Sequence, residues 1–432
     1  MKEFDPIIGY TEIKRELSQI ADMMRNAGEY EKLGVRLPYG LMLHGSPGVG
    51  KTLMANCLIK ASGRKVFICR KDKPNGEFIK VITNIFEEAA ANAPAIVFLD
   101  DMDKFANTDT EHTYAEEYIS VQSCIDQYKG RDVFVLATVN DIRMLPSSLR
   151  RVGRFDRVIE VPTPNNKDAE KILAHYLKDK KAVADINTEM LVRLMGGMSC
   201  ATLETIINEA GVYAGYERAD SIGMDHLLKS CLRTMFDTPA GGDYDDDYYY
   251  CSGESQREQI AVHEAGHVVV SEVLFPGSVT LAAFNEKEGS YGGITSCFYS
   301  DSADMRWQKS RIVTALGGMA AMEHQFGFAG AGSCKDIREA SIALRSMIGN
   351  EGIAGFGLIG YSYNLSQELK HHQEIANSAL LNQYYLKAKE IIAKNPELFS
   401  KVTEKLLDDS VITMEEIDIL RKTCTIAPVE LG

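Results

Sequence analysis

The feature that most constrains this chain is the sequence His263-Glu264-Ala265-Gly266-His267, which lies inside an apolar run. Because positions i and i+4 of a helix share one face, His263 and His267 can offer two ring nitrogens to one metal ion. Glu264 lies beside them, where it can take a proton from a metal-bound water. The pattern predicts a zinc site of the kind that hydrolyses peptide bonds. The alternative is a half-buried helix that happens to carry two histidines.

Two histidines require a third protein ligand, and several side chains farther along the chain could supply it. The candidates are Glu323, His324, Asp336, Glu339, His371 and His372. Asp336 follows Ser333, a suitable N-cap, at the start of an expected helix. On its own, Asp336 can equally be a first-turn acid that the helix dipole favours. The residues alone therefore leave the third ligand open.

A second motif occupies residues 45–52 and reads Gly-x-x-x-x-Gly-Lys-Thr. It stands between an expected buried strand at 39–44 and an expected helix at 53–61, which is the context of a phosphate-binding P-loop. Lys51 would reach the β- and γ-phosphates and Thr52 would bind Mg²⁺. We expect nucleotide contacts from Gly45, Ser46, Pro47, Gly48, Val49, Gly50, Lys51, Thr52 and Leu53. The alternative is a Gly-rich turn that binds no nucleotide.

Three more buried strands are expected, at 65–69, 95–99 and 133–139. The second ends in a Walker B pattern, in which Asp100 holds the Mg²⁺ shell and Asp101 polarises the attacking water. The third ends in Asn140, which is placed to contact the γ-phosphate or that water. A strand-end acid that caps the next helix is the alternative for the acidic pair.

An arginine-rich stretch at 147–157 stands out in a chain whose net charge is -14. Arg151 and Arg154 are candidates for an arginine finger that reads the γ-phosphate bound by a neighbouring subunit. A solvated basic turn is the alternative. The negative net charge argues against a general nucleic-acid binder, which presents a basic surface.

Together, the P-loop, the acidic pair, Asn140 and the sequence Arg151-x-Gly153-Arg154-Phe155-Asp156-Arg157 resemble an AAA+ ATPase module. With the His-Glu-x-x-His pattern, the whole chain resembles the FtsH family of ATP-dependent zinc metalloproteases, from about residue 5 to about residue 421. The resemblance implies an α/β AAA+ P-loop domain, a helical lid and a mainly α-helical zinc metallopeptidase domain. Between the lid and the peptidase domain, glycines and consecutive acids indicate a flexible linker, and a passive surface loop is the alternative. The expected bounds of these four parts, in chain order, are 1–165, 166–237, 238–252 and 253–432.

The resemblance also implies the cofactors Zn²⁺, ATP and Mg²⁺, with Asp336 as the third zinc ligand and Ile8 and Gly9 beside the nucleotide. It implies a homohexameric ring, because an arginine finger acts across a subunit boundary. ATP hydrolysis would move polypeptide substrates through this ring to the zinc site. The alternatives are an ATP-gated peptidase for unfolded chains or oligopeptides, and an ATP-binding scaffold or chaperone with impaired hydrolysis.

The chain departs from the family pattern at three places. It starts directly at the ATPase, whereas family members usually carry transmembrane segments first. We therefore expect a soluble form, a processed piece or a subunit recruited by a membrane partner. Asp101 stands where the family has Glu, and its shorter side chain predicts slower ATP hydrolysis. The loop at 73–78 has Gly76 but no aromatic residue two positions earlier, which predicts a weak grip on folded substrates unless Phe78 replaces it.

Other features predict the cellular compartment and the helices and strand that surround the two sites. No apolar run approaches the roughly 18 residues of a membrane helix, and nine scattered cysteines without a C-x-x-C pair indicate reduced thiols in the cytoplasm. An edge strand is expected at 292–298, where it could hold a substrate backbone by strand addition. Helices are expected at 168–177, 188–195, 199–215, 224–236, 255–274, 307–323 and, as a helical tail, within 397–421.

Overall fold

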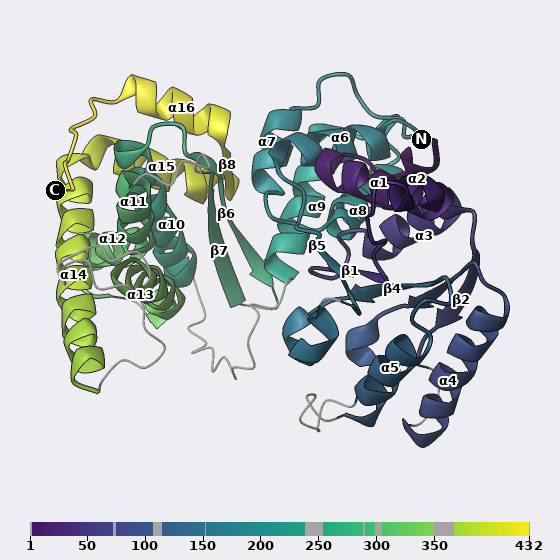
Figure 1. The fold of residues 1–432 in the computed structure, drawn as a ribbon. Helices are drawn as coiled ribbons and strands as arrows, with labels where there is room; N and C mark the ends of the chain where they lie inside the picture. Colours follow the sequence, from purple (N-terminus) through teal and green to yellow (C-terminus); the bar gives the residue numbers. More distant parts are fainter. Residues whose placement is uncertain are drawn as a thin grey trace. The chain divides into compact units, whose positions relative to one another are not determined.

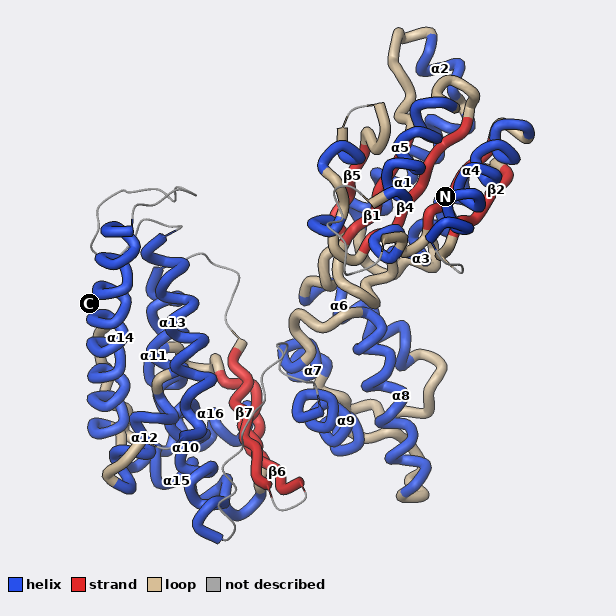
Figure 2. The backbone as a smooth tube through the Cα atoms, turned by 90° about the horizontal axis from the view of Figure 1, so that it is seen from below, coloured by secondary structure: helices blue, strands red, loops and turns tan. Residues whose placement is uncertain are grey.

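The computed structural model describes residues 2–71, 75–106, 115–151, 153–237, 254–287, 290–298, 305–329, 331–349 and 367–431. The chain forms two compact units, Met1–Leu232 and Arg233–Gly432, each with its own hydrophobic packing. Figure 1 labels most of their helices and strands, and Figure 2 shows that helices make up most of both units. The predicted linker lies outside the described residues, and the four domain bounds stay a prediction.

The first unit is built on a parallel sheet with the strand order β2-β3-β4-β1-β5. Its strands are β1 (Gly40–His44), β2 (Lys65–Cys69), β3 (Ala95–Leu99), β4 (Val133–Val139) and β5 (Arg157–Glu160). The first four confirm the predicted strands. β5 begins at Arg157, the last residue of the arginine-rich stretch, and was not predicted. Ile159 alone among its residues is buried, so the sequence shows no apolar run there.

Helices cover both faces of this sheet (Figure 1). They are α1 (Thr11–Arg25), α3 (Lys51–Ser62), α4 (Asn75–Ala91) and α5 (Glu116–Gln127), whereas the short α2 (Ala27–Glu31) follows α1 and buries no residue. Because successive strand side chains point to opposite faces, Leu41 and Leu43 pack with α1 and α3, whereas Met42 packs with α4 and α5. The carboxyl ends of β1, β4 and β3 are neighbours, so the P-loop, Asn140 and the acidic pair meet at one edge.

Phe78 lies near the start of α4 and is fully buried. Its ring meets the ring of Phe105 edge to face, with centroids 4.9 Å apart. Residues 73–74 of the loop expected to grip the substrate lie outside the described residues. Because Phe78 belongs to the core, it does not replace the missing aromatic residue of the substrate grip.

Four helices follow the sheet and closely match the helices expected in the lid. They are α6 (Asn166–Leu177), α7 (Thr188–Leu194), α8 (Cys200–Tyr216) and α9 (Met224–Asp237). The Ser199 side chain accepts a hydrogen bond from the Thr202 N–H and so caps α8. The Ala201 N–H donates to the Gly48 carbonyl at 3.0 Å, which bonds α8 directly to the P-loop.

The second unit is a helical bundle beside a small antiparallel sheet. Its strands are β6 (Val279–Lys287), β7 (Ser290–Cys297) and β8 (Val411–Thr413), in the order β7-β6-β8. Among the described strands, β7 pairs with β6 alone, which confirms the predicted edge strand. β8 corrects the expectation of a purely helical tail, because Ile412 is buried where this short segment pairs with β6.

Seven helices of the second unit are described: α10 (Glu254–Leu274), α11 (Met305–Ala315), α12 (Gly317–Phe326), α13 (Cys334–Gly349), α14 (Gln367–Lys394), α15 (Pro396–Asp409) and α16 (Met414–Thr423). α10 is central and packs against α11, α12, α14, α15 and both long strands. Within the described ranges, no helix is long and apolar enough to cross a membrane.

The single helix expected at 307–323 is wrong, because α11 and α12 separate at Leu316. After this break, α12 crosses α10 at very short range. A Cβ atom on Gly266 would lie 2.4 Å from the Gly317 carbonyl oxygen, and one on Gly317 would lie 2.7 Å from the Gly266 carbonyl oxygen. Only glycine fits at either position, and the crossing fixes α10 against α12.

Candidate active sites

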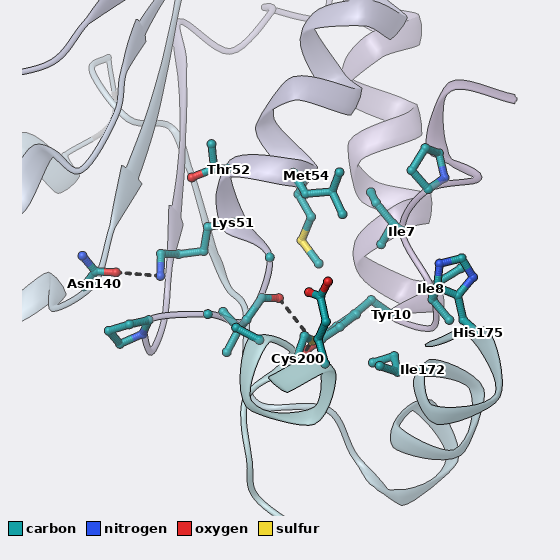
Figure 3. Close-up of a pocket in the computed structure, with 18 of the residues that line it drawn as sticks. Ile7, Ile8, Tyr10, Lys51, Thr52, Met54, Asn140, Ile172, His175 and Cys200 are labelled. Carbon is teal, nitrogen blue, oxygen red and sulfur yellow. Dashed lines mark hydrogen bonds between the residues drawn. The ribbon is translucent and has the colours of Figure 1, made fainter. Parts of the chain in front are cut away.

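A cavity of about 670 Å³ opens where the P-loop meets the N-terminal segment and the lid (Figure 3). Its lining includes ten of the predicted nucleotide-site residues: Ile8, Pro47, Gly48, Val49, Gly50, Lys51, Thr52, Leu53, Asp101 and Asn140. Gly9, Gly45, Ser46 and Asp100 are not in the lining, although each is adjacent in sequence to a residue that is, or bonded to one. The structure thus brings most of these residues together at one cavity, and their contacts with a nucleotide stay a prediction.

The two ends of the cavity differ in chemistry. Lys51 and Asn140 lie at one end, and Ile8, Ile172 and His175 lie at the other (Figure 3). Cations and amides suit phosphates, and an apolar end with rings suits a nucleobase. The lid residues of the lining, Ile172, His175, Tyr176, Cys200 and Glu204, were missed because they belong to no motif.

Lys51 is buried at the phosphate end and already has three acceptors. Its Nζ donates to the carbonyls of Gly45 at 2.7 Å and Ser46 at 2.9 Å, and to Asn140 Oδ1 at 2.9 Å. Burial lowers the pKa of Lys51, and the nearby charges of Asp101 and Asp103 oppose this shift. The contacts join the ends of β1 and β4 through one ammonium group.

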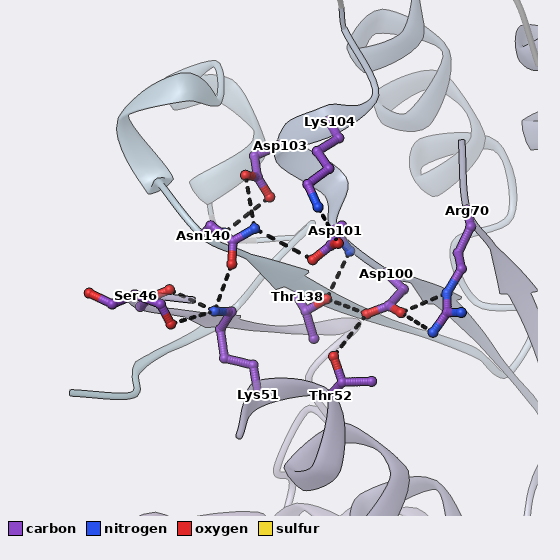
Figure 4. A network of polar contacts seen from close by, with 11 residues as sticks. Ser46, Lys51, Thr52, Arg70, Asp100, Asp101, Asp103, Lys104, Thr138 and Asn140 are labelled. Atoms are coloured by element: carbon purple, nitrogen blue, oxygen red, sulfur yellow. Dashed lines mark hydrogen bonds and ion pairs between the residues drawn. The ribbon is translucent and has the colours of Figure 1, made fainter. Parts of the chain in front are cut away.

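Asp100 is buried and bonded on both carboxylate oxygens (Figure 4). Its Oδ1 accepts from Thr138 Oγ1 at 2.7 Å and from Thr52 Oγ1 at 3.3 Å. Its Oδ2 accepts from Arg70 Nε at 2.7 Å. Thr52 and Asp100 are the oxygen donors expected to share a Mg²⁺ ion, so the donor set fits that ion. Arg70 and Thr138 have no motif that would have revealed them.

Asp101 has left-handed backbone angles, with φ 53° and ψ 49°. Its carboxylate lies 2.7 Å from Lys104 Nζ and 3.5 Å from Asn140 Nδ2, as Figure 4 shows. The hydrogen bond with Asp101 raises the pKa of Lys104. Asn140 is itself held by Asp103, which accepts from its backbone N–H at 3.0 Å. Lys104 and Asp103 are therefore additional members of this polar network.

We expect Arg70→Ala to lower the Mg²⁺ concentration for half-maximal ATP hydrolysis by about two- to fivefold. Arg70 is exposed and pairs with the buried Asp100, so its positive charge competes with a cation for that carboxylate. The measurement is a Mg²⁺ titration of ATPase rate at saturating ATP. Arg15→Ala, which removes an exposed ion pair with Glu12, is the matched control. A half-saturation point that rises or stays the same would contradict the competition.

Arg151 and Arg154 lie outside the cavity lining. Arg151 is exposed at the end of the turn Ser147–Arg150. Arg154 is anchored instead, because Nη2 lies 2.7 Å from Asp126 Oδ2 and Nη1 donates to Gln122 at 2.8 Å. A role toward a neighbouring subunit stays a prediction for both arginines.

The second site brings together His263 and His267 of α10 with Asp336 of α13. His263 Nε2 lies 3.0 Å from both His267 Nε2 and Asp336 Oδ2, and His267 Nε2 lies 3.6 Å from that oxygen. The three candidate ligand atoms lie within 4.8 Å of one another. The other third-ligand candidates that the structure describes are not in this cluster: Glu323, His324, Glu339, His371 and His372.

The donor chemistry of this cluster fits zinc. His267 Nδ1–H donates to the Thr314 carbonyl at 2.7 Å, which leaves Nε2 as the atom that can bind a metal. Two imidazole nitrogens and one carboxylate oxygen are a catalytic zinc set that keeps one position open. Thr314 could not be predicted from the sequence, because it orients His267 through its backbone carbonyl, which every residue type has.

Proton binding in the metal-free cluster is set by the neighbours of each ligand. Burial alone would lower the pKa of His267, but the hydrogen bond with Asp336 and the nearby acids outweigh it and raise this pKa to about 9. Burial would raise the pKa of Asp336, but hydrogen bonds from His263 and His267 hold it well below its usual range. Without a metal, His267 therefore holds a proton beside the ionised carboxylate of Asp336.

Zinc affinity is expected to rise by about tenfold per pH unit while zinc displaces that one proton. The pKa of His267 is raised from its ordinary value of 6.5 to about 9, so His267 keeps its proton up to about pH 9. Zinc affinity should therefore still rise between pH 6.5 and about pH 9, and it should level off above that pH. Competition with a coloured chelator at a series of pH values measures the affinity. His324→Ala, whose ring contacts Phe399 outside the cluster, should keep the same slope. A zinc affinity independent of pH would show that no proton is displaced.

Glu264 is buried beside the cluster and contacts the edge strand. Its Oε2 accepts a hydrogen bond from Thr295 Oγ1 at 2.6 Å. A Cβ atom on Gly293 would lie 2.2 Å from its Oε1. The predicted acid–base residue therefore lies between the metal-ligand cluster and β7, where a peptide could be held.

Comparison with known proteins covers both sites. Residues 41–163 match the ATPase family associated with various cellular activities (AAA), and residues 251–420 match peptidase family M41. The chain is 28% identical over 440 residues to the ATP-dependent zinc metalloprotease FtsH 2 of Sphaerobacter thermophilus, which covers 96% of this chain and 66% of that protein. It is 28% identical over 456 residues to the ATP-dependent zinc metalloprotease FtsH of Ureaplasma parvum, with 98% and 61% covered.

A third relative, the ATP-dependent zinc metalloprotease FtsH 2 of Thermoanaerobacter sp., is 28% identical over 432 residues, with 96% of this chain and 82% of that protein covered. The chain spans less than two thirds of the length of the first two relatives. Both family matches include the motif residues around which the two sites are built, Lys51 in the first and His263 in the second.

Proposed function

We propose that this chain, which belongs to the FtsH family, is an ATP-dependent zinc metalloprotease that moves polypeptides through an AAA+ ring and hydrolyses them. Its cofactors are Zn²⁺, ATP and Mg²⁺. The observation that carries the proposal is the cluster of His263, His267 and Asp336 beside Glu264, in a chain that also has a nucleotide cavity.

The peptidase half would work as follows. His263, His267 and Asp336 would hold zinc, which when bound polarises the scissile carbonyl and lowers the pKa of water. Glu264 would take the proton of the attacking water and return it to the leaving amine. Among the described strands β7 pairs with β6 alone, and backbone groups on its other edge could hydrogen-bond an extended peptide. This mode of binding predicts little dependence on substrate side chains.

The ATPase half has a matching division of roles. Lys51 would replace its hydrogen bonds to the loop carbonyls by contacts with the β- and γ-phosphates. Thr52 and Asp100 would hold Mg²⁺. Asp101 would orient the attacking water, and Asn140 Nδ2 lies 3.5 Å from the Asp101 carboxylate. Because α8 is hydrogen-bonded to Gly48, closure of the lid and occupation of the P-loop would be linked.

The assembly we propose is a homohexamer. Family members act on protein substrates and assemble into oligomers, and the six-membered ring is the specific form proposed for this chain. Arg151 is exposed and free to reach outward, and Arg154 would support the same turn through its bonds to Asp126. The two arginines would then complete the nucleotide site of the next subunit.

The compartment we propose is the cytoplasm. The eight described cysteines form no disulfide, and four of them are buried in the first unit: Cys57, Cys69, Cys124 and Cys231. A reducing compartment keeps cysteines in the thiol form.

Degradation of casein and of a stably folded protein by the purified, zinc-loaded chain tests the proposal. We expect casein cleavage that requires hydrolysable ATP, and that stops with a zinc chelator or a non-hydrolysable analogue. Equal cleavage without nucleotide would mean that the ATPase does not drive the reaction. No cleavage of either substrate in the presence of zinc and ATP would overturn the protease assignment.

A further inference from the structure

We infer that Thr295 of the edge strand is a positioning residue for Glu264, so that the strand that holds the substrate also aims the catalytic base. The inference rests on the proposed peptidase function and deepens it. It concerns how the base is oriented, and it assigns a role to a side chain that carries no catalytic group of its own.

The geometry begins with one short hydrogen bond. Thr295 Oγ1 lies 2.6 Å from Glu264 Oε2 and 3.4 Å from the Glu264 backbone carbonyl oxygen. A hydroxyl has one proton to donate, and the carboxylate oxygen is the closer and stronger acceptor. The side chain of Glu264 is buried, so no bulk water replaces this donor if it is lost. One oxygen of the carboxylate is thereby fixed to β7.

Gly293 fixes the other side of the same carboxylate. A Cβ atom at this position would lie 2.2 Å from Glu264 Oε1 and 2.8 Å from its Cδ and Cγ. Gly293 and Thr295 are two residues apart on one strand, so they share the face that packs on α10. The glycine provides room for the carboxylate and the threonine orients it.

The other edge of β7 connects this contact to substrate binding. The backbone of β7 is paired with β6 on one edge and has no partner strand on the other edge among the described strands. A peptide added to that free edge would be hydrogen-bonded to the strand that also carries Gly293 and Thr295. Its scissile bond and the Glu264 carboxylate would therefore be positioned by one rigid element. Loss of the hydroxyl should affect the chemical step and leave peptide binding unchanged.

The test compares Thr295→Val, which keeps the shape and removes the donor, with Thr295→Ser, which keeps the donor. With a short unstructured peptide as substrate, Thr295→Val should lower kcat by about 10- to 100-fold with little change in KM. Thr295→Ser should restore kcat to within about threefold of wild type. Ser296→Ala, one residue along β7, is the control and should match wild type. Zinc content and thermal midpoint, measured on every variant, should not differ from wild type.

Three results would overturn the inference: a Val variant with wild-type kcat, a Ser variant as slow as the Val variant, or a change in KM alone. If Thr295→Val fails to fold or to hold zinc, Thr295→Ala compared with Thr295→Ser gives the same contrast. Wild-type cleavage separates this test from the proposed function. If wild type does not cleave the peptide with zinc bound, the peptidase proposal fails first, whereas active wild type with an equally active Val variant overturns only the role of Thr295.

Discussion

Glu264→Gln is expected to lower kcat for peptide cleavage by about 10³-fold, because it removes the group that takes the proton of the attacking water. The substitution is nearly isosteric, and Gln keeps an oxygen that can accept the hydrogen bond from Thr295. The three candidate zinc ligands are untouched, so the zinc content should equal that of wild type. The measurement is single-turnover cleavage of a short peptide, together with zinc analysis of the same sample.

Glu258→Gln is the matched control, because Glu258 is an exposed acid on the same helix. It should cleave the peptide at the wild-type rate. ATP hydrolysis should be unaffected in both variants, since the nucleotide cavity is lined by residues of the first unit. Equal cleavage by wild type and Glu264→Gln, with zinc bound in both, would remove Glu264 from the mechanism.

Lys51→Ala is expected to lower the rate of ATP hydrolysis by at least about 10²-fold, the usual loss for one preorganised donor at a charged transition state. Lys51 is buried and joins Gly45, Ser46 and Asn140 in one network, so the substitution removes the cation that the phosphates would meet. Degradation of a folded substrate should be lost with ATP hydrolysis. Cleavage of a short peptide, which needs no pulling, should persist at the metal site.

The control for this variant is Lys60→Ala, an exposed lysine on the same helix, α3. It should hydrolyse ATP and degrade the folded substrate as wild type does. The informative comparison is between the two substrates. If Lys51→Ala still degrades the folded protein at the wild-type rate, ATP hydrolysis at this cavity does not power unfolding.

The parts of the fold that could be predicted are those that local sequence determines. β3 is apolar throughout and β4 is apolar except for Thr138, because both faces of these strands are covered. The P-loop can be recognised because its backbone needs glycine and its chemistry needs Lys51. β5 could not be predicted in the same way, because it lies at the sheet edge and buries only Ile159. The break between α11 and α12 depends on a neighbouring helix that no local pattern describes.

The same limit applies to the sites. Asp336 is separated from His263 by 73 positions, and the tertiary fold brings it to the two histidines. No local sequence pattern distinguishes it from the other candidate third ligands. The resemblance to a family selected it where residue types could not. Arg70, Thr295 and the Thr314 carbonyl support the reacting groups by single contacts across the fold. A threonine or an arginine that acts through one contact has no recognisable spacing in a sequence.

The close crossing of α10 and α12 gives the three metal ligands unequal freedom. His263 and His267 lie on a helix whose crossing with α12 leaves no room for a Cβ atom on Gly266 or Gly317. Asp336 lies in the first turn of α13, and a Cβ atom on Gly332, just ahead of that helix, would meet no atom within 4 Å. Differences in ionic radius between zinc and a larger divalent ion such as Cd²⁺ should therefore be absorbed on the Asp336 side of the cluster. The histidine pair would stay in place as the fixed half of the coordination sphere.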